Sequence, residues 1–419
     1  MIIITSSYSN SHRAHLLLMN VLLMVLAVFT MSCHRSSSVT PLESKPRAIF
    51  VFGDSLVDPG NNNYISGTLA KNNFYPFGID FPIGKTFTGC FTNGRTIIDI
   101  IGEELGVKDY IPPYMDPTTV GDVVLRGVNY ASGGAGILND TGAIFGNRFN
   151  MDAQLDNFAN TRNYIISNIS GVGSKKLLEK ALFLVVMGSN EFIDNYFTPI
   201  VSIPKQKLVS PEIFVDSMIS KFRLQLTRLY KMDARKIAVA NVGPVGCIPI
   251  ERALNYKSWY TTSDSCISAM NNAAMVFNKK LKSLIIELNS NLVQSKFVYV
   301  DSYGVISHIF HNYKSYGFED YKTACWKVLP DSSWKLYKPA PLVCKDRSNS
   351  TNSATPLESH DMDEPRAMYI FGDSLVDAGN INYINPLTKN NNYPNGIDFP
   401  SGKRFTGRST NGRTVVDII

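Results

Sequence analysis

The stretch that decides the fold is residues 46–64, PRAIFVFGDSLVDPGNNNY. Its apolar run at residues 48–52 predicts a buried strand of a parallel sheet, because the run is continuous and is bounded by Pro46 and Gly53. Ser55 follows this strand, and open α/β sheets bind ligands at the carboxyl ends of their strands. A lone serine in such a turn is usually only a helix cap, so the surrounding residues must decide its role.

The residues after the strand have a characteristic order. GDSL at residues 53–56 is followed directly by VDPGNNN at residues 57–63. This order resembles the first block of the plant GDSL esterases and lipases, a branch of the SGNH hydrolases. The resemblance implies that Ser55 is a nucleophile that attacks an ester carbonyl, and it implies no metal or cofactor.

The same stretch occurs a second time. Residues 365–384 read PRAMYIFGDSLVDAGNINYI, so that Ser374 repeats Ser55. A solenoid needs several adjacent copies of one stacking unit, which this chain does not have. We therefore expect one GDSL domain at residues 46–344 that lacks its C-terminal block, a linker at 345–364 and a truncated second copy at 365–419.

An isolated strand and helix cannot bury enough surface to fold alone. The second copy is therefore expected to be disordered, to dock on the edge of the first domain, or to displace the strand at residues 48–52, with which its own strand at residues 367–371 is nearly interchangeable. The abrupt join suggests two neighbouring gene copies run together, either in the genome or in the prediction of the gene.

Composition and charge indicate a globular protein. The 419 residues are 44% hydrophobic and 18% charged, which allows a buried core. The formal charge of +6 is spread along the chain, and no Lys/Arg block indicates a nucleic-acid partner.

The N-terminal residues predict that the protein is secreted. An apolar stretch at residues 16–29 follows His12 and Arg13 and precedes small and polar residues, which is the layout of a signal peptide at residues 1–35. The stretch is shorter than the roughly 20 residues that span a bilayer. No later segment is apolar enough to cross one, so we expect a secreted, extracellular protein without an integral membrane segment.

Sequons and cysteines fit an oxidising, secretory compartment. Three candidate glycosylation sites have the Asn-X-Ser/Thr pattern: Asn139, Asn168 and Asn349. Cys33 is expected to leave with the signal peptide. Two cysteine pairs each flank a loop and could form local disulfides: Cys247 with Cys266, and Cys325 with Cys344. Cys90 is left over, and no cysteine spacing resembles a zinc site.

Strands and helices alternate after the opening stretch. The apolar patterns predict further strands at residues 123–130, 181–187, 236–242 and 297–300, and helices at 96–105, 152–169, 211–232 and 265–292. Asp152 is expected to cap the second of these helices. The alternation predicts an α/β fold, a three-layer α/β/α sandwich around a parallel five-stranded sheet. The resemblance implies the flavodoxin-like strand order of SGNH hydrolases.

Two later segments match further blocks of the family. The small residues ASGGAG at 131–136 follow the second predicted strand, and the resemblance implies that Gly134, or alternatively Gly133, supplies a backbone N–H to an oxyanion hole. GSNEF at 188–192 follows the third strand, where the resemblance implies that the Asn190 amide is another oxyanion donor. Without the resemblance, Asn190 would be interpreted as a helix N-cap.

The general base of a serine hydrolase is not found in the sequence. The family carries it in a late Asp-X-X-His block, but none of His308, His311 and His360 has an aspartate three residues before it. His308 and His311 could form a metal pair, although two polar residues on a surface helix fit better. His360 lies in the linker, which is poorly suited to hold catalytic geometry.

The sequence therefore predicts a GDSL esterase or lipase whose substrate is a lipid ester or the ester of an acylated carbohydrate or small molecule. The alternatives are a non-catalytic protein that binds such esters and a fused tandem gene product.

Overall fold

The computed structural model describes most of residues 46–316. The described residues are 46, 48–73, 77–78, 81, 89–92, 94–107, 110–197, 209–248, 251–252 and 266–316, with the backbone alone of 326–328 and 337–339. Several predicted features lie outside them: the signal peptide, the linker, the second copy with Ser374, and the residues Cys325, Cys344, Asn349 and His360.

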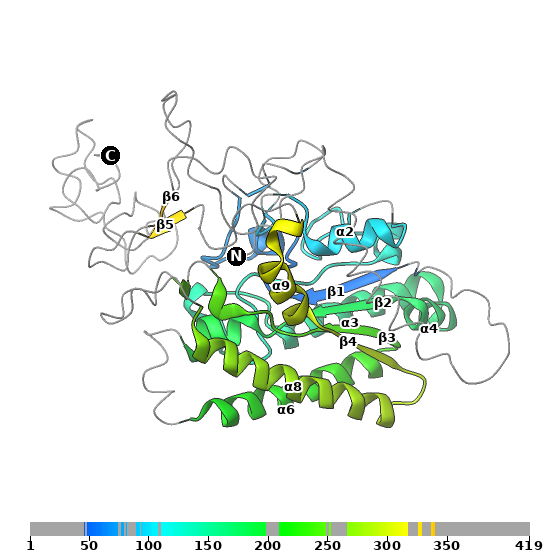
Figure 1. The fold of residues 1–419 in the computed structure, drawn as a ribbon. Helices are drawn as coiled ribbons and strands as arrows, with labels where there is room; N and C mark the ends of the chain where they lie inside the picture. The colour runs from blue at the N-terminus through cyan, green and yellow to red at the C-terminus, as the bar shows by residue number, and fades with distance from the viewer. Residues whose placement is uncertain are drawn as a thin grey trace, which may run out of the picture.

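Four parallel strands form the central sheet of the described residues (Figure 1). They are β1 (Ile49–Gly53), β2 (Leu182–Val186), β3 (Lys236–Ala240) and β4 (Lys296–Val300), in that order across the sheet. Ile49 lies opposite Leu182 and Gly53 opposite Val186, so the first two strands end together. All four carboxyl ends therefore share one edge, and the predicted α/β class with a parallel sheet is confirmed.

The prediction of a strand at residues 123–130 is wrong. Gly121–Arg126 forms a short 3-10 helix, η3, and only the residues after it run along β1. Val51 N–H donates to Val128 O at 3.0 Å, and Tyr130 N–H donates to Val51 O at 2.8 Å. The chain can enter this position because Gly127 has a φ of 125°, and a Cβ there would lie 1.9 Å from Ile49 O.

Residues 128–132 thus occupy the place of the fifth strand, beside β1 and opposite β2, with one isolated parallel bridge. The order of this segment, β1, β2, β3 and β4 across the sheet is the flavodoxin-like order of doubly wound folds.

Helices cover both faces of the sheet (Figure 1). One face carries α3 (Met151–Ile169), α4 (Gly171–Lys180), α6 (Pro211–Lys231) and α8 (Ser268–Asn291), which share one buried cluster. The other face packs against α2 (Ile97–Glu104), with α9 (Ser302–His311) on the same side.

The N-cap of α3 is Asn150 and not the predicted Asp152, because the Asn150 side chain accepts the N–H of Ala153. The helix α4 was not predicted, since its polar sequence GVGSKKLLEK shows little apolar periodicity.

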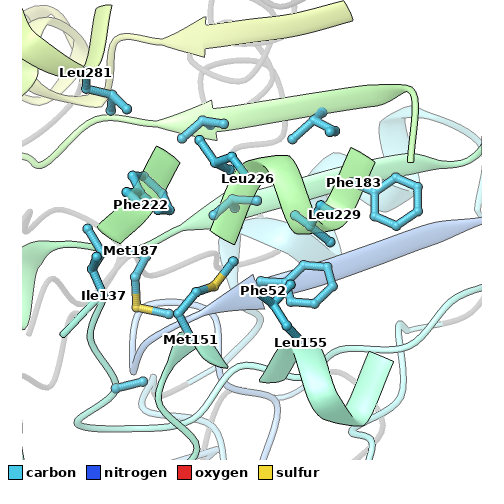
Figure 2. Packing of buried hydrophobic residues seen from close by; sticks show 14 of the residues in the cluster. Phe52, Ile137, Met151, Leu155, Phe183, Met187, Phe222, Leu226, Leu229 and Leu281 are labelled. Atoms are coloured by element: carbon cyan, nitrogen blue, oxygen red, sulfur yellow. The ribbon is translucent and has the colours of Figure 1, made fainter. Parts of the chain in front are cut away.

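The core explains why β1 is apolar throughout. Phe50 and Phe52 point to the larger cluster, while Ile49 and Val51 point to the opposite one. Phe50 lies 5.4 Å from the ring of Phe158 on α3, measured between centroids. Figure 2 shows Phe52 in this cluster with side chains from β2, α3 and α6. A strand buried on both faces needs a continuous apolar run.

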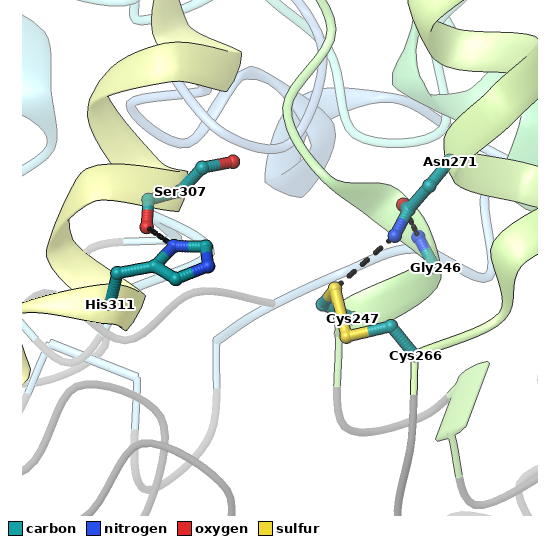
Figure 3. Close-up of a disulfide and its surroundings, with 6 residues drawn as sticks. All are labelled: Gly246, Cys247, Cys266, Asn271, Ser307 and His311. Carbon is teal, nitrogen blue, oxygen red and sulfur yellow. Dashed lines mark hydrogen bonds between the residues drawn. A yellow bond between two sulfur atoms is a disulfide. The ribbon is translucent and has the colours of Figure 1, made fainter.

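The predicted Cys247–Cys266 disulfide is present, with a Cα–Cα distance of 4.3 Å (Figure 3). Asn271 on α8 accepts the N–H of Gly246 at 2.8 Å, beside the bridge. The disulfide thereby ties the segment after β3 to the beginning of α8.

Cys90 is buried. None of the described helices combines the length and apolarity needed to cross a membrane.

Candidate active site

Ser55 lies two residues beyond the end of β1, in a turn that a buried glutamine holds. Gly53 N–H donates to Gln154 Oε1 at 2.9 Å, and Gln154 Nε2 donates back to Gly53 O at 2.8 Å. On the other side, Asp54 N–H donates to Val186 O at 3.2 Å. Gln154 is fully buried on α3, so its amide supports the backbone next to Ser55. Sequence analysis missed Gln154; its only signal is a polar residue on the apolar face of a helix.

Asp58 joins the Ser55 loop to the glycine turn of the second block. Its Oδ1 accepts the N–H groups of Gly60 and Asn61 at 2.8 Å each. Its Oδ2 accepts the N–H of Gly133 at 3.0 Å. Asp58 is fully buried, and burial raises the pKa of its carboxyl to about 7, although the backbone donors oppose this rise.

The asparagines that follow Asp58 extend this connection. Asn61 Nδ2 donates to Asn129 O at 2.9 Å and to Ala131 O at 2.8 Å. Asn62 Nδ2 donates to Gly133 O at 3.0 Å. The GNNN sequence therefore binds the backbone of residues 129–133, a role that sequence analysis did not assign.

Among the described residues, the backbone N–H groups of Ser55 and Gly134 have no protein acceptor. The neighbouring N–H of Gly133 is occupied by Asp58, so only Gly134 of the two predicted alternatives offers a free donor. Gly134 has a φ of 78°, a conformation that favours glycine. Gly134 is buried, and a buried N–H group without a partner is rare, which indicates a ligand position, whereas Ser55 is partly exposed and can also reach solvent.

Asn190 brings the third block to the same turn. It lies four residues beyond β2, is 6% exposed, and its Nδ2 donates to Ala135 O at 2.8 Å. Asn190 is the N-cap residue of the π-helical turn η5 (Glu191–Tyr196) by position, but its side chain makes no capping hydrogen bond to that turn. Ser55, Gly134 and Asn190 thus lie on three segments that direct hydrogen bonds join.

Two further buried acids flank the turn. Glu191 Oε1 accepts the N–H of Leu138 and the hydroxyl of Thr141, both at 3.1 Å. Asp54 Oδ1 accepts the N–H of Leu56 at 3.0 Å, and its Oδ2 has no partner among the described residues. Burial raises the pKa of each of these two carboxyls to about 7.

The comparison with known proteins agrees with this arrangement. The sequence model of the GDSL-like Lipase/Acylhydrolase family matches residues 49–340. The chain belongs to this family. It is 50% identical over 331 residues to GDSL esterase/lipase At4g16230 of Arabidopsis thaliana, covering 79% of this chain and 88% of the relative. GDSL esterase/lipase At3g50400 of the same plant is 45% identical over 305 residues, covering 72% of this chain and 80% of the relative.

A GDSL esterase/lipase is a hydrolase that acts on ester bonds, and its serine needs a base. The two described histidines are both exposed on α9. His311 Nδ1 contacts Ser307 O at 2.6 Å (Figure 3), and His308 Nδ1 contacts the Tyr316 hydroxyl at 3.3 Å. Their hydrogen bonds are thus local to α9 and the turn after it. In the described part of the chain, no group of three acidic, histidine or cysteine side chains could hold a metal ion.

Proposed function

We propose that this chain is a secreted GDSL esterase in which Ser55 attacks the carbonyl of a lipid ester or another carboxylic ester. The observation that carries the proposal is the pair of free N–H groups on Ser55 and Gly134, beside the Asn190 amide. Such donors stabilise the negative charge that develops on the carbonyl oxygen, by about 3 to 4 kcal/mol for one donor.

The donors are held in place before the substrate arrives. Asn190 Nδ2 donates one hydrogen to Ala135 O, and its second hydrogen is the one that would bind the oxyanion. Asp58 and Gln154 fix the backbone on either side of Ser55. Fixed donors need no reorganisation during the reaction, which is the source of their catalytic effect.

The step that these residues do not supply is removal of the Ser55 proton. No Asp-X-X-His occurs among residues 36–419. This observation favours a second function, in which the same site binds an ester without turnover. Both functions use Ser55, Gly134 and Asn190, and they differ only in whether a base reaches Ser55.

Secretion is part of the proposal. Asn139 and Asn168, two of the three candidate glycosylation sites, have exposed side chains. The Cys247–Cys266 disulfide is of the kind that persists in oxidising compartments. Both features support removal of residues 1–35 as a signal peptide.

Hydrolysis of p-nitrophenyl acetate and butyrate by the purified full chain tests the esterase. We expect turnover that Ser55→Ala abolishes and that the matched control Ser290→Ala, an exposed serine on α8, leaves unchanged. A loss of turnover in His360→Ala would identify the linker histidine as the base. Equal rates for the folded wild type and Ser55→Ala would contradict the esterase and favour the binding function.

A further inference from the structure

Two loops beside the candidate site form a paired ridge. One follows the Ser55 block and the other follows the Gly134 block. Leu69 N–H donates to Phe145 O at 2.8 Å, and Asn147 N–H donates to Gly67 O at 3.1 Å. An antiparallel bridge joins Thr68 to Gly146 between these hydrogen bonds. The ridge is therefore a defined structure built from the two segments that carry Ser55 and Gly134.

The ridge continues directly from the oxyanion turn. A Cβ on Gly134 would lie 2.9 Å from Phe145 Cδ2, so the Phe145 ring packs against the α-carbon of Gly134. On the adjacent residue, a Cβ on Gly133 would lie 2.2 Å from Phe91 Cζ. Both rings are only half-buried, so part of each apolar surface remains exposed.

Large apolar side chains extend the surface outward. Leu69 is 51% exposed and Ile144 is 42% exposed, and both lie on the ridge next to Phe145. We call Leu69, Ile144 and Phe145 the acyl ridge. Exposed apolar side chains beside a binding site are a common means of recognising apolar ligands.

Arg148 makes the ridge rigid. Its Nε donates to Thr141 O at 2.5 Å, its Nη2 to Asn139 O at 2.8 Å, and its Nη1 to Gly146 O at 3.1 Å. These bonds fix the loop that carries Ile144 and Phe145. A surface that is rigid before binding loses little conformational freedom when a ligand binds.

We propose that the acyl ridge binds the hydrocarbon chain of the ester whose carbonyl lies at Ser55, so that esters of medium-chain acids are preferred over acetates. This proposal rests on the proposed function, since it places the carbonyl at Ser55 and Gly134. The contact of Phe145 with Gly134 favours an acyl chain over a lipid surface, because Phe145 then adjoins the residue whose N–H would bind the carbonyl oxygen.

Binding of straight-chain alkylboronic acids, from ethyl to octyl, tests the ridge without requiring turnover. Boron takes the place of the ester carbonyl carbon: Ser55 Oγ bonds to boron, the hydroxyl proton passes to the solvent, and a tetrahedral boronate forms. Calorimetry with the full chain gives each Kd. We expect the Kd of the wild type to fall by about fourfold for each added methylene that is buried. Leu69→Ser and Ile144→Ser, at the two ridge residues that do not pack against Gly134, should weaken octylboronic acid binding by about tenfold or more while leaving ethylboronic acid binding unchanged.

The controls separate failure of the ridge from failure of the site. Leu224→Ser alters an apolar residue of α6 that is 67% exposed and lies on a different element, and it should change neither Kd. If Ser55→Ala left ethylboronic acid binding intact, the ester site itself would be wrong. If ethylboronic acid needed Ser55 but the ridge variants kept the wild-type dependence on chain length, only the ridge proposal would be wrong. The ridge variants could instead lose binding to phosphatidylcholine vesicles and keep the wild-type dependence of Kd on chain length. That result would assign the ridge to a lipid surface and overturn the proposal.

Discussion

Replacing Gln154 by alanine tests whether this residue positions the Ser55 turn for ligand binding in addition to stabilising the fold. The change removes three hydrogen bonds: the two buried ones with Gly53 and a partly buried one from Nε2 to Phe149 O at 2.8 Å. Gly53 O keeps the N–H of Ser132 at 3.1 Å, but Gly53 N–H loses its acceptor. An unsatisfied buried donor and the lost bonds together predict a decrease of about 2 to 4 kcal/mol in the free energy of unfolding.

The chain offers a matched control in Gln225 on α6. It is 2% exposed, and its Nε2 donates to Ile137 O and to Asp152 Oδ1, both at 3.0 Å. Gln225→Ala should therefore cost a similar free energy of unfolding, which urea titration measures. Only Gln154→Ala should weaken ethylboronic acid binding, by about tenfold or more, because a displacement near 1 Å disrupts a catalytic arrangement.

The positioning role of Gln154 would be refuted if the two variants had equal effects on stability and on ligand affinity. If Gln154→Ala and Gln225→Ala lost similar stability and retained the same affinity for ethylboronic acid, Gln154 would be a structural residue only. Gln154→Glu provides a second test. It keeps the acceptor for Gly53 N–H but replaces the donor to Gly53 O, so it should recover affinity as the pH falls and the new carboxyl becomes protonated.

Two further predictions concern the glycine turn and the buried acids. Gly134→Ala should lower ethylboronic acid affinity and decrease the free energy of unfolding by about 1 to 3 kcal/mol, because alanine is strained at a φ of 78° and its Cβ would meet Phe145; unchanged values would contradict this geometry. The folded pKa of Asp54 is raised from 3.8 to about 7 and that of Glu191 from 4.5 to about 7. The folded state therefore holds these protons more tightly than the unfolded chain does, and its stability should fall as the pH rises from about 4 to 7. Thermal unfolding should show a higher Tm at pH 5 than at pH 8, with a smaller difference in Asp54→Asn; an unchanged difference in that variant would contradict the assignment to Asp54.

The sheet could be predicted where sequence pattern and burial agree. The strands β1 and β2 are buried on both faces, and their continuous apolar runs predict both position and direction. Residues 123–130 contain a similar apolar pattern, but a short 3-10 helix can bury it equally well. Gly127 was the available signal, because its positive φ ends that helix before the chain joins β1.

The candidate site could be predicted only in part, because its supports come from distant residues. Asp58 reaches Gly133 across 75 positions, and Gln154 reaches Gly53 across 101. No local pattern predicts such pairs. The choice between Gly133 and Gly134 also depended on the fold, since it is Asp58 that occupies one N–H and leaves the other free.

The contacts of the first copy bear on the role of the second. In the repeat, Tyr369 stands at the position of Phe50 and Ile381 at that of Asn62. Phe50 is fully buried between the rings of Phe158 and Phe183, where a tyrosine hydroxyl would have no partner in the cluster. An isoleucine at the second position would remove the donor to Gly133 O and the acceptor of the Ser132 hydroxyl. Each unsatisfied group costs about 1 to 3 kcal/mol, so the second copy fits the β1 position less well than the first copy does, which argues against exchange.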